Sequence, residues 1–127
     1  MQRLVLCSTA ALLTLAACAP STGPMAGGGA RSDQNQCFRP DLVRNFTAPS
    51  DQTLYVRTVD ADVFRIDTVG CRDLQGSLSI ALEPLVGTSR LCVGDPAGLI
   101  ARSPCRVRVG KKLTTDEIAA LPSRDRP

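Results

Sequence analysis

The chain has 127 residues, with 15 Lys or Arg against 12 Asp or Glu, so its formal net charge is only +3. This balance, together with an aromatic content of 3%, argues against a nucleic-acid partner. Histidine and tryptophan are absent, which removes the usual general base, the commonest metal ligand and the ring that stacks best on sugars, so we expect no enzyme activity, no metal and no cofactor.

Residues 1–17 have the pattern of a lipoprotein signal peptide. After Arg3, residues 4–17 are uncharged, rich in Leu and Ala, and fewer than the roughly 20 residues of a membrane-spanning helix. The stretch ends in Leu15-Ala16-Ala17-Cys18, which resembles the lipobox of bacterial lipoproteins. The resemblance implies cleavage before Cys18, a diacylglycerol thioether on its sulfur, and acylation of the new amino terminus. A membrane partner held through this lipid anchor is therefore expected.

The same residues also allow ordinary secretion. Ala17-Cys18-Ala19 fits a small-residue cleavage site, which would release a soluble periplasmic protein that begins at Pro20. We prefer lipidation because the order of residues up to Cys18 and the apolar stretch agree with it. Ala19 is not the Asp that retains lipoproteins in the inner membrane under the enterobacterial sorting rule. An outer-membrane lipoprotein facing the periplasm is thus the expected product.

The mature chain divides into three parts. Residues 18–36 are expected to be the acylated cysteine and a flexible linker, because they are rich in Gly, Pro, Ser and Ala. A coil of this length reaches about 20–25 Å. Residues 37–121 carry the pattern of one folded domain, and residues 122–127 are expected to be a disordered tail.

Four cysteines lie in the predicted domain: Cys37, Cys71, Cys92 and Cys105. An even number in an exported protein suits two disulfides, and the lack of any C-x-x-C pair argues against zinc or a redox-active site. Three pairings are possible. We expect Cys92 with Cys105, across one turn, and Cys37 with Cys71, which would tie the start of the domain to its middle.

Alternation of apolar and polar residues predicts a small, mainly β domain of short antiparallel strands, with α+β as the alternative. Residues 54–59 and 63–69 form a predicted hairpin. The residues expected on its buried face are Leu54, Val56, Thr58, Phe64, Ile66 and Thr68. A three-residue loop, Asp60-Ala61-Asp62, would pair Val56 with Ile66 and put Asp62 in the left-handed conformation.

Further strands are expected at residues 77–82, 89–93 and 106–109. Asp95-Pro96-Ala97-Gly98 predicts a type I turn, and a helical turn is expected to start at Pro40. Thr114-Thr115-Asp116-Glu117 is a capping box, which predicts one short C-terminal helix that ends before Pro122.

Short landmarks are spread along the predicted domain. They are Cys37-Phe38, Asn45-Phe46, Leu54-Tyr55-Val56, Cys71-Arg72-Asp73-Leu74, Leu91-Cys92-Val93-Gly94-Asp95 and Cys105-Arg106-Val107. These landmarks resemble a domain family of unknown function found in secreted proteins and lipoproteins of proteobacteria. The resemblance implies a disulfide-bearing envelope domain and no activity.

Basic residues near the end of the chain form a candidate anion-binding stripe of Arg106, Arg108, Lys111 and Lys112. Arg106 and Arg108 are expected on one strand face, with Val107 and Val109 on the other. The stripe would meet anionic lipid or an acidic partner. The alternative is a solvated strand face that protects a sheet edge.

Two weaker patterns could also carry chemistry. Asp60, Asp62 and Asp67 offer the oxygen ligands that calcium prefers, although an Asp-rich hairpin tip is the commoner explanation. Ser103 with Lys111 or Lys112 has the residue types of a serine–lysine pair, but nothing in the sequence places these residues together.

The sequence therefore predicts a non-catalytic cell-envelope lipoprotein, a tethered domain that binds or supports another envelope protein. The alternative is a periplasmic inhibitor that inserts an exposed loop, at residues 60–62 or 94–104, into a hydrolase. The partner and the oligomeric state stay open.

Overall fold

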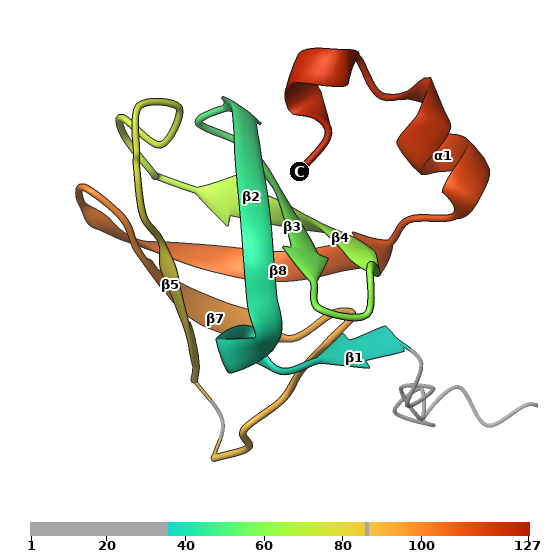
Figure 1. The fold of residues 1–127 in the computed structure, drawn as a ribbon. Helices are drawn as coiled ribbons and strands as arrows, with labels where there is room; N and C mark the ends of the chain where they lie inside the picture. Colours follow the sequence, from blue (N-terminus) through green and yellow to red (C-terminus); the bar gives the residue numbers. More distant parts are fainter. Residues whose placement is uncertain (1–35, 86) are drawn as a thin grey trace, which may run out of the picture.

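The computed structural model describes residues 36–85 and 87–127. The predicted signal peptide, Cys18 and all of the predicted linker but Gln36 lie outside these residues. The described chain forms an antiparallel six-stranded sheet in the order β2-β3-β4-β8-β7-β5, with a second, two-stranded sheet of β1 and β6 (Figure 1). The prediction of a mainly β domain with one short helix is confirmed.

The elements follow one another along the chain with short connections. The strands are β1 (Cys37–Phe38), β2 (Val43–Ser50), β3 (Thr53–Thr58), β4 (Val63–Val69), β5 (Ala81–Pro84), β6 (Leu91–Cys92), β7 (Pro96–Ile100) and β8 (Pro104–Lys112). The helical segments are the 3-10 turns η2 (Pro40–Leu42) and η3 (Ser123–Asp125) and the α-helix α1 (Thr115–Ala120).

Strands β3 and β4 bury every second side chain, as the alternation predicted. Leu54 and Val56 on β3 and Phe64 and Ile66 on β4 are fully buried, while Arg65 between the last two is exposed. This alternation gives the large sheet an inner face toward the core and an outer face away from it.

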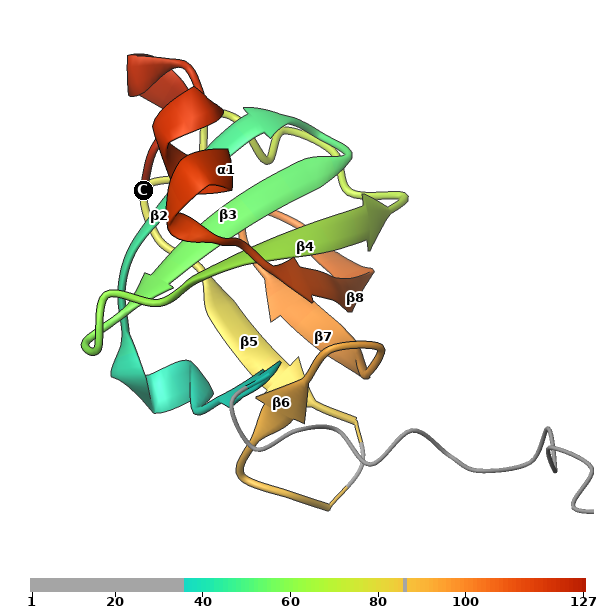
Figure 2. The same ribbon diagram turned by 90° about the vertical axis from the view of Figure 1, so that its right-hand side faces the viewer.

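The small sheet closes one end of the inner face of the large one. Phe38 of β1 lies against Phe64, with ring centroids 4.6 Å apart, and Leu91 of β6 is 1% exposed. Figure 2 shows β1 and β6 beneath the ends of β5 and β7. Each apolar side chain that becomes fully buried here contributes roughly 1.5–3 kcal/mol, so β1 and β6 complete the core.

The β3–β4 hairpin has the odd loop length predicted, but at a different position. The amide of Thr58 donates to the carbonyl oxygen of Asp62 (2.9 Å), so the loop is Val59-Asp60-Ala61. Val56 pairs with Phe64, not with Ile66, and Ala61 rather than Asp62 is left-handed, with φ 66°. A two-residue shift keeps every side chain on its face, so alternation cannot distinguish the two registers.

The predicted disulfide pairing is wrong. The bonds join Cys37 to Cys92 and Cys71 to Cys105. Cys37 and Cys92 lie directly opposite each other in the β1–β6 ladder. Cys105 is on β8, which pairs with β4 just before Cys71, and strand β7 separates Cys105 from Cys92.

Strand β7 occupies the place of the predicted type I turn. The turn lies just before this strand, between Cys92 and Asp95. The amide of Asp95 donates to the carbonyl oxygen of Cys92 (2.9 Å), and the Asp95 carboxylate accepts from the amide of Cys92 (2.9 Å). Gly94 supplies the left-handed residue, with φ 94°. Pro96 is the first residue of β7, a strand position that tolerates proline.

Several other boundaries differ from the predictions. The helical turn at Pro40 ends at Leu42 as a single 3-10 turn, and the chain continues directly into β2. The strand expected at residues 77–82 lies later in the chain, as β5 (Ala81–Pro84), and the strand expected at residues 89–93 shortens to β6 (Leu91–Cys92). The capping box at Thr114 and Glu117 is confirmed, and α1 starts at Thr115.

Residues 122–127 fold back onto the sheet, so the expectation of a disordered tail is wrong. The hydroxyl of Thr47 on β2 donates to the carbonyl oxygen of Asp125 (2.5 Å), and Nε of Arg57 on β3 donates to that of Pro127 (2.6 Å). Arg126 also bonds back to the carbonyl oxygen of Ala119 (2.6 Å). These contacts join polar side chains to backbone oxygens. They therefore produce no periodic pattern of apolar residues from which the sequence could predict them.

Candidate functional site

The C-terminal segment divides the outer face of the large sheet. It reaches β2 and β3 through Thr47 and Arg57, and Figures 1 and 2 show α1 and the segment after it at this end of the sheet. We call the remaining outward side chains of β4, β8 and β7 the open face. Its members are Arg65, Asp67, Val69, Arg106, Arg108, Lys111, Pro96, Gly98 and Ile100.

The predicted basic stripe lies partly on the open face. Arg106 and Arg108 are exposed on β8, while Val107 and Val109 are buried on the other side, as expected. Strand β8 lies inside the sheet, between β4 and β7. The alternative interpretation, protection of a sheet edge, therefore does not apply to these arginines.

Lys112 does not belong to the stripe. Its Nζ forms an ion pair with Asp62 (2.7 Å) and lies 6.0 Å from the centroid of the Phe64 ring. A bulge at Gly110 shifts the register between β4 and β8, so that Lys112 pairs with Phe64. The charge of Lys112 is thus engaged within the fold, and its role in anion binding stays a prediction.

The remaining cations of the open face differ in their partners. Lys111 bonds to Glu117 at the start of α1, and Arg65 pairs with Asp67 (2.8 Å). Arg108 donates to the carbonyl oxygen of Gly94 (2.8 Å) and has no ion pair among the described residues, although Asp67 lies opposite it in the β4–β8 ladder. The side chain of Arg106 has no hydrogen bond or ion pair with any residue the structure describes, whereas its backbone pairs with β4 and β7.

The Lys111–Glu117 pair has an electrostatic consequence. The hydrogen bond from Lys111, followed by that from the Thr114 amide, holds the pKa of Glu117 below its ordinary value. Glu117 is therefore ionised well into the acid range and keeps Lys111 engaged.

The aspartates near the hairpin do not converge on a cation. Asp62 faces Lys112 and Asp67 faces Arg65, at 2.7 and 2.8 Å. Within residues 36–85 and 87–127, no three His, Cys, Asp or Glu side chains form a group able to hold a metal ion. The geometry therefore favours the hairpin-tip explanation over calcium.

The structure also separates the candidate serine–lysine pair. Ser103 precedes β8 and Lys111 is near its far end, so about 25 Å of extended strand lies between them. No proton can pass directly between two groups at this separation.

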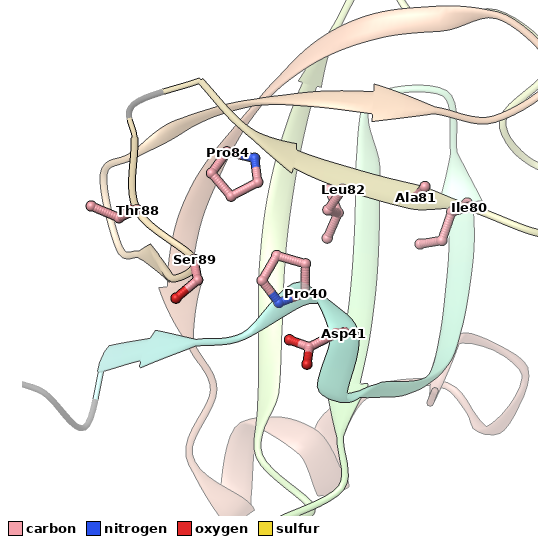
Figure 3. Close-up of a pocket in the computed structure, with 8 residues that line it drawn as sticks. All are labelled: Pro40, Asp41, Ile80, Ala81, Leu82, Pro84, Thr88 and Ser89. Atoms are coloured by element: carbon pink, nitrogen blue, oxygen red, sulfur yellow. The ribbon is translucent and has the colours of Figure 1, made fainter.

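A groove that the sequence analysis missed lies beside the free edge of β5. Its volume is about 470 Å³, and its walls are Pro40, Asp41, Ile80, Ala81, Leu82, Pro84, Thr88 and Ser89. Figure 3 shows Ile80, Ala81 and Leu82 on one side and Pro40 and Asp41 on the other. Asp41 is the one titratable residue among them, and it is paired with Arg39 (2.7 Å). The groove can receive apolar groups but offers no acid–base pair.

No protein-family model matches this chain, and no curated protein or solved structure matches it either. The resemblance to the proteobacterial domain family stays a prediction. The two disulfides are typical of proteins outside the reducing cytoplasm. In the described ranges, no helix has the length and apolar character needed to cross a bilayer.

Proposed function

We propose that the protein is a non-catalytic lipoprotein of the cell envelope, anchored through Cys18 in the outer membrane with its domain facing the periplasm. The observation that carries the proposal is the sequence Leu15-Ala16-Ala17-Cys18 at the end of a short apolar stretch. The disulfide-bonded β domain that begins at Cys37 supports it, because such a domain suits an oxidising compartment.

The attachment of the domain to its predicted tether is consistent with this function. The carbonyl oxygen of Gln36 accepts from the amide of Val93 (3.0 Å), and the next residue, Cys37, is bonded covalently to Cys92. A force applied to the chain before Gln36 is therefore transmitted to β6 through the disulfide, so that β1 cannot detach from β6.

A structural or binding role fits the surface better than the hydrolase-inhibitor alternative. Five of the residues 94–104 form β7, inside the sheet, so only residues 101–103, between β7 and β8, remain there as a short loop. The hairpin tip is held at both ends: the amide of Val59 donates to the carbonyl oxygen of Leu42 (2.9 Å), and Asp62 is paired with Lys112. Two short loops, this tip and residues 101–103, are left for an inhibitor.

The anchor is tested by detergent-phase partition of the protein made in its native host. We expect the wild-type chain in the detergent phase and in outer-membrane fractions, and the Cys18→Ser variant in the aqueous phase. A wild-type chain that stays in the aqueous phase, or a Cys18→Ser variant that partitions like wild type, contradicts the proposal.

The role of the domain is tested by cross-linking in intact cells. A structural or binding role predicts capture of envelope proteins without loss of their activity. Tight capture of a hydrolase with loss of its turnover would support the inhibitor instead.

A further inference from the structure

The open face carries four cations and one acidic residue, Asp67, and Glu83 of β5 lies beside Gly98 on the same side of the sheet. Of its four cations, Lys111 and Arg65 have acidic partners, whereas Arg106 and Arg108 have no acidic partner among the described residues. Both guanidinium groups point outward from the same strand, two residues apart, and present donors to solvent.

Exposed apolar side chains lie next to these arginines. Val69 is 73% exposed and directly opposite Arg106 in the β4–β8 ladder. Ile100, on the β7 side, is 44% exposed. Arginines without an ion pair, beside exposed aliphatic side chains, suit a surface that is both anionic and partly apolar, which is the character of a phospholipid headgroup region.

The open face is also next to the point where the chain before the domain begins. Arg108 bonds to the carbonyl oxygen of Gly94, and the preceding residue, Val93, bonds to Gln36. The 17 residues between Cys18 and Gln36 span at most about 60 Å even when fully extended. A lipid on Cys18 would therefore hold this side of the domain near the membrane at a high effective concentration.

We propose that the open face docks on the anionic phospholipid headgroups of the membrane that carries the anchor. Arg106 and Arg108 bind the phosphates, and Val69 and Ile100 enter the headgroup region. This inference rests on the proposed lipid anchor. Docking through the open face would give the tethered domain a fixed orientation on the membrane. In this orientation the groove beside β5 stays available to other partners.

The experiment uses tryptophan as a reporter, because the chain contains none. The acylated protein with Val69→Trp is placed in vesicles of phosphatidylcholine, with or without 30% phosphatidylglycerol and with brominated acyl chains. We expect quenching and a blue shift of the fluorescence in the anionic vesicles alone. The matched reporter Leu78→Trp, at a residue that is 96% exposed and outside the open face, should stay unquenched.

Charge-matched variants test the role of the arginines. Arg106→Gln with Arg108→Gln should lower the docked population about 30-fold, since each cation near an anionic surface contributes about 1 kcal/mol. Arg44→Gln with Arg124→Gln removes the same charge from exposed positions outside the open face and should leave quenching unchanged.

Two results would overturn the docking. They are an unquenched Val69→Trp in anionic vesicles, and equal quenching of the two reporters. An intact mass of the sample without acyl chains would instead refute the anchor, so the two failures are distinguishable.

Discussion

Gly110 shows how one residue fixes the junction between β4 and β8. A Cβ at this position would lie 2.6 Å from Oδ2 of Asp67 and 3.2 Å from the carbonyl oxygen of Arg65. Asp67 cannot move freely, because it is paired with Arg65 (2.8 Å). The bulge that turns Lys112 toward Asp62 therefore depends on the absence of a side chain here.

We predict that Gly110→Ala lowers the free energy of unfolding by about 1–2 kcal/mol, from overpacking against Asp67 and the strand backbone. Gly98→Ala is the matched control, because the nearest atom to its Cβ would be 3.7 Å away and the gain in chain stiffness is the same. Urea unfolding of both variants measures the difference. Equal midpoints would show that the bulge tolerates a side chain.

Glu117 links β8 to α1 and gives the domain a pH dependence. The hydrogen bond from Lys111 is the main reason that its folded-state pKa is lowered. A lowered pKa adds stability that is complete above the ordinary pKa of glutamate and is lost as the pH falls through the folded-state value. The stabilising contribution of Glu117 to the folded state is therefore lost only at acidic pH.

We predict that an NMR titration of the Glu117 side chain gives a pKa below that of an ordinary glutamate. Lys111→Met should raise this pKa, because it removes the main stabilising partner of the carboxylate. The control Lys112→Met should leave it unchanged, because Lys112 pairs with Asp62. An unshifted Glu117 in wild type would contradict the ion pair.

At the scale of the elements, the two disulfides hold different parts of the fold. Cys37–Cys92 joins the two strands of the small sheet, and Cys71–Cys105 joins the end of β4 to β8. They close stretches with sequence separations of 55 and 34 residues. In the chain-entropy model, each is worth about 4 kcal/mol.

We predict that replacing either pair of cysteines with serine costs about 4 kcal/mol of unfolding free energy. Only the loss of Cys37–Cys92 should also free the first strand, so that added protease cuts near Phe38 while the core of the large sheet stays protected. Calorimetry and limited proteolysis measure the two effects. Identical cleavage patterns for the two variants would contradict the role of Cys37–Cys92 at the start of the domain.

Sequence periodicity predicted the faces of strands but not their partners. Leu54, Val56, Phe64 and Ile66 were placed correctly because alternation follows from the pleat itself. The disulfide pairing depended on β7, whose Pro96 and Gly98 are typical of turns. With β7 taken for a turn, Cys92 and Cys105 seemed neighbours across one connection, and the pairing followed that error.

The same limit applied to the candidate site. Arg106 and Arg108 could be assigned to one exposed face, because that assignment needs only the period of a strand. The different fate of Lys112 could not be predicted, since it depends on a bulge at Gly110 and on Asp62 across the hairpin. The groove beside β5 brings together residues about 40 positions apart, and no local pattern signals it.

At the scale of the whole molecule, the protein has a small β domain whose first strand is bonded covalently to β6. The predicted lipid is at Cys18, and the first described cysteine, Cys37, is bonded to Cys92 inside the domain. The C-terminal segment contacts the outer face at β2 and β3, and the rest of that face carries Arg106 and Arg108, which have no ion pair among the described residues. Under the proposed anchor and docking, this asymmetry gives the domain a side to turn toward the membrane.

The most direct test of the account is the intact mass of the protein purified from native membranes without reductant. We expect a chain that starts at Cys18, carries diacylglycerol and an amide-linked acyl group, and has lost the hydrogens of its two disulfides. A chain that starts at Pro20 without lipid, or that keeps its uncleaved leader, would contradict the central claim.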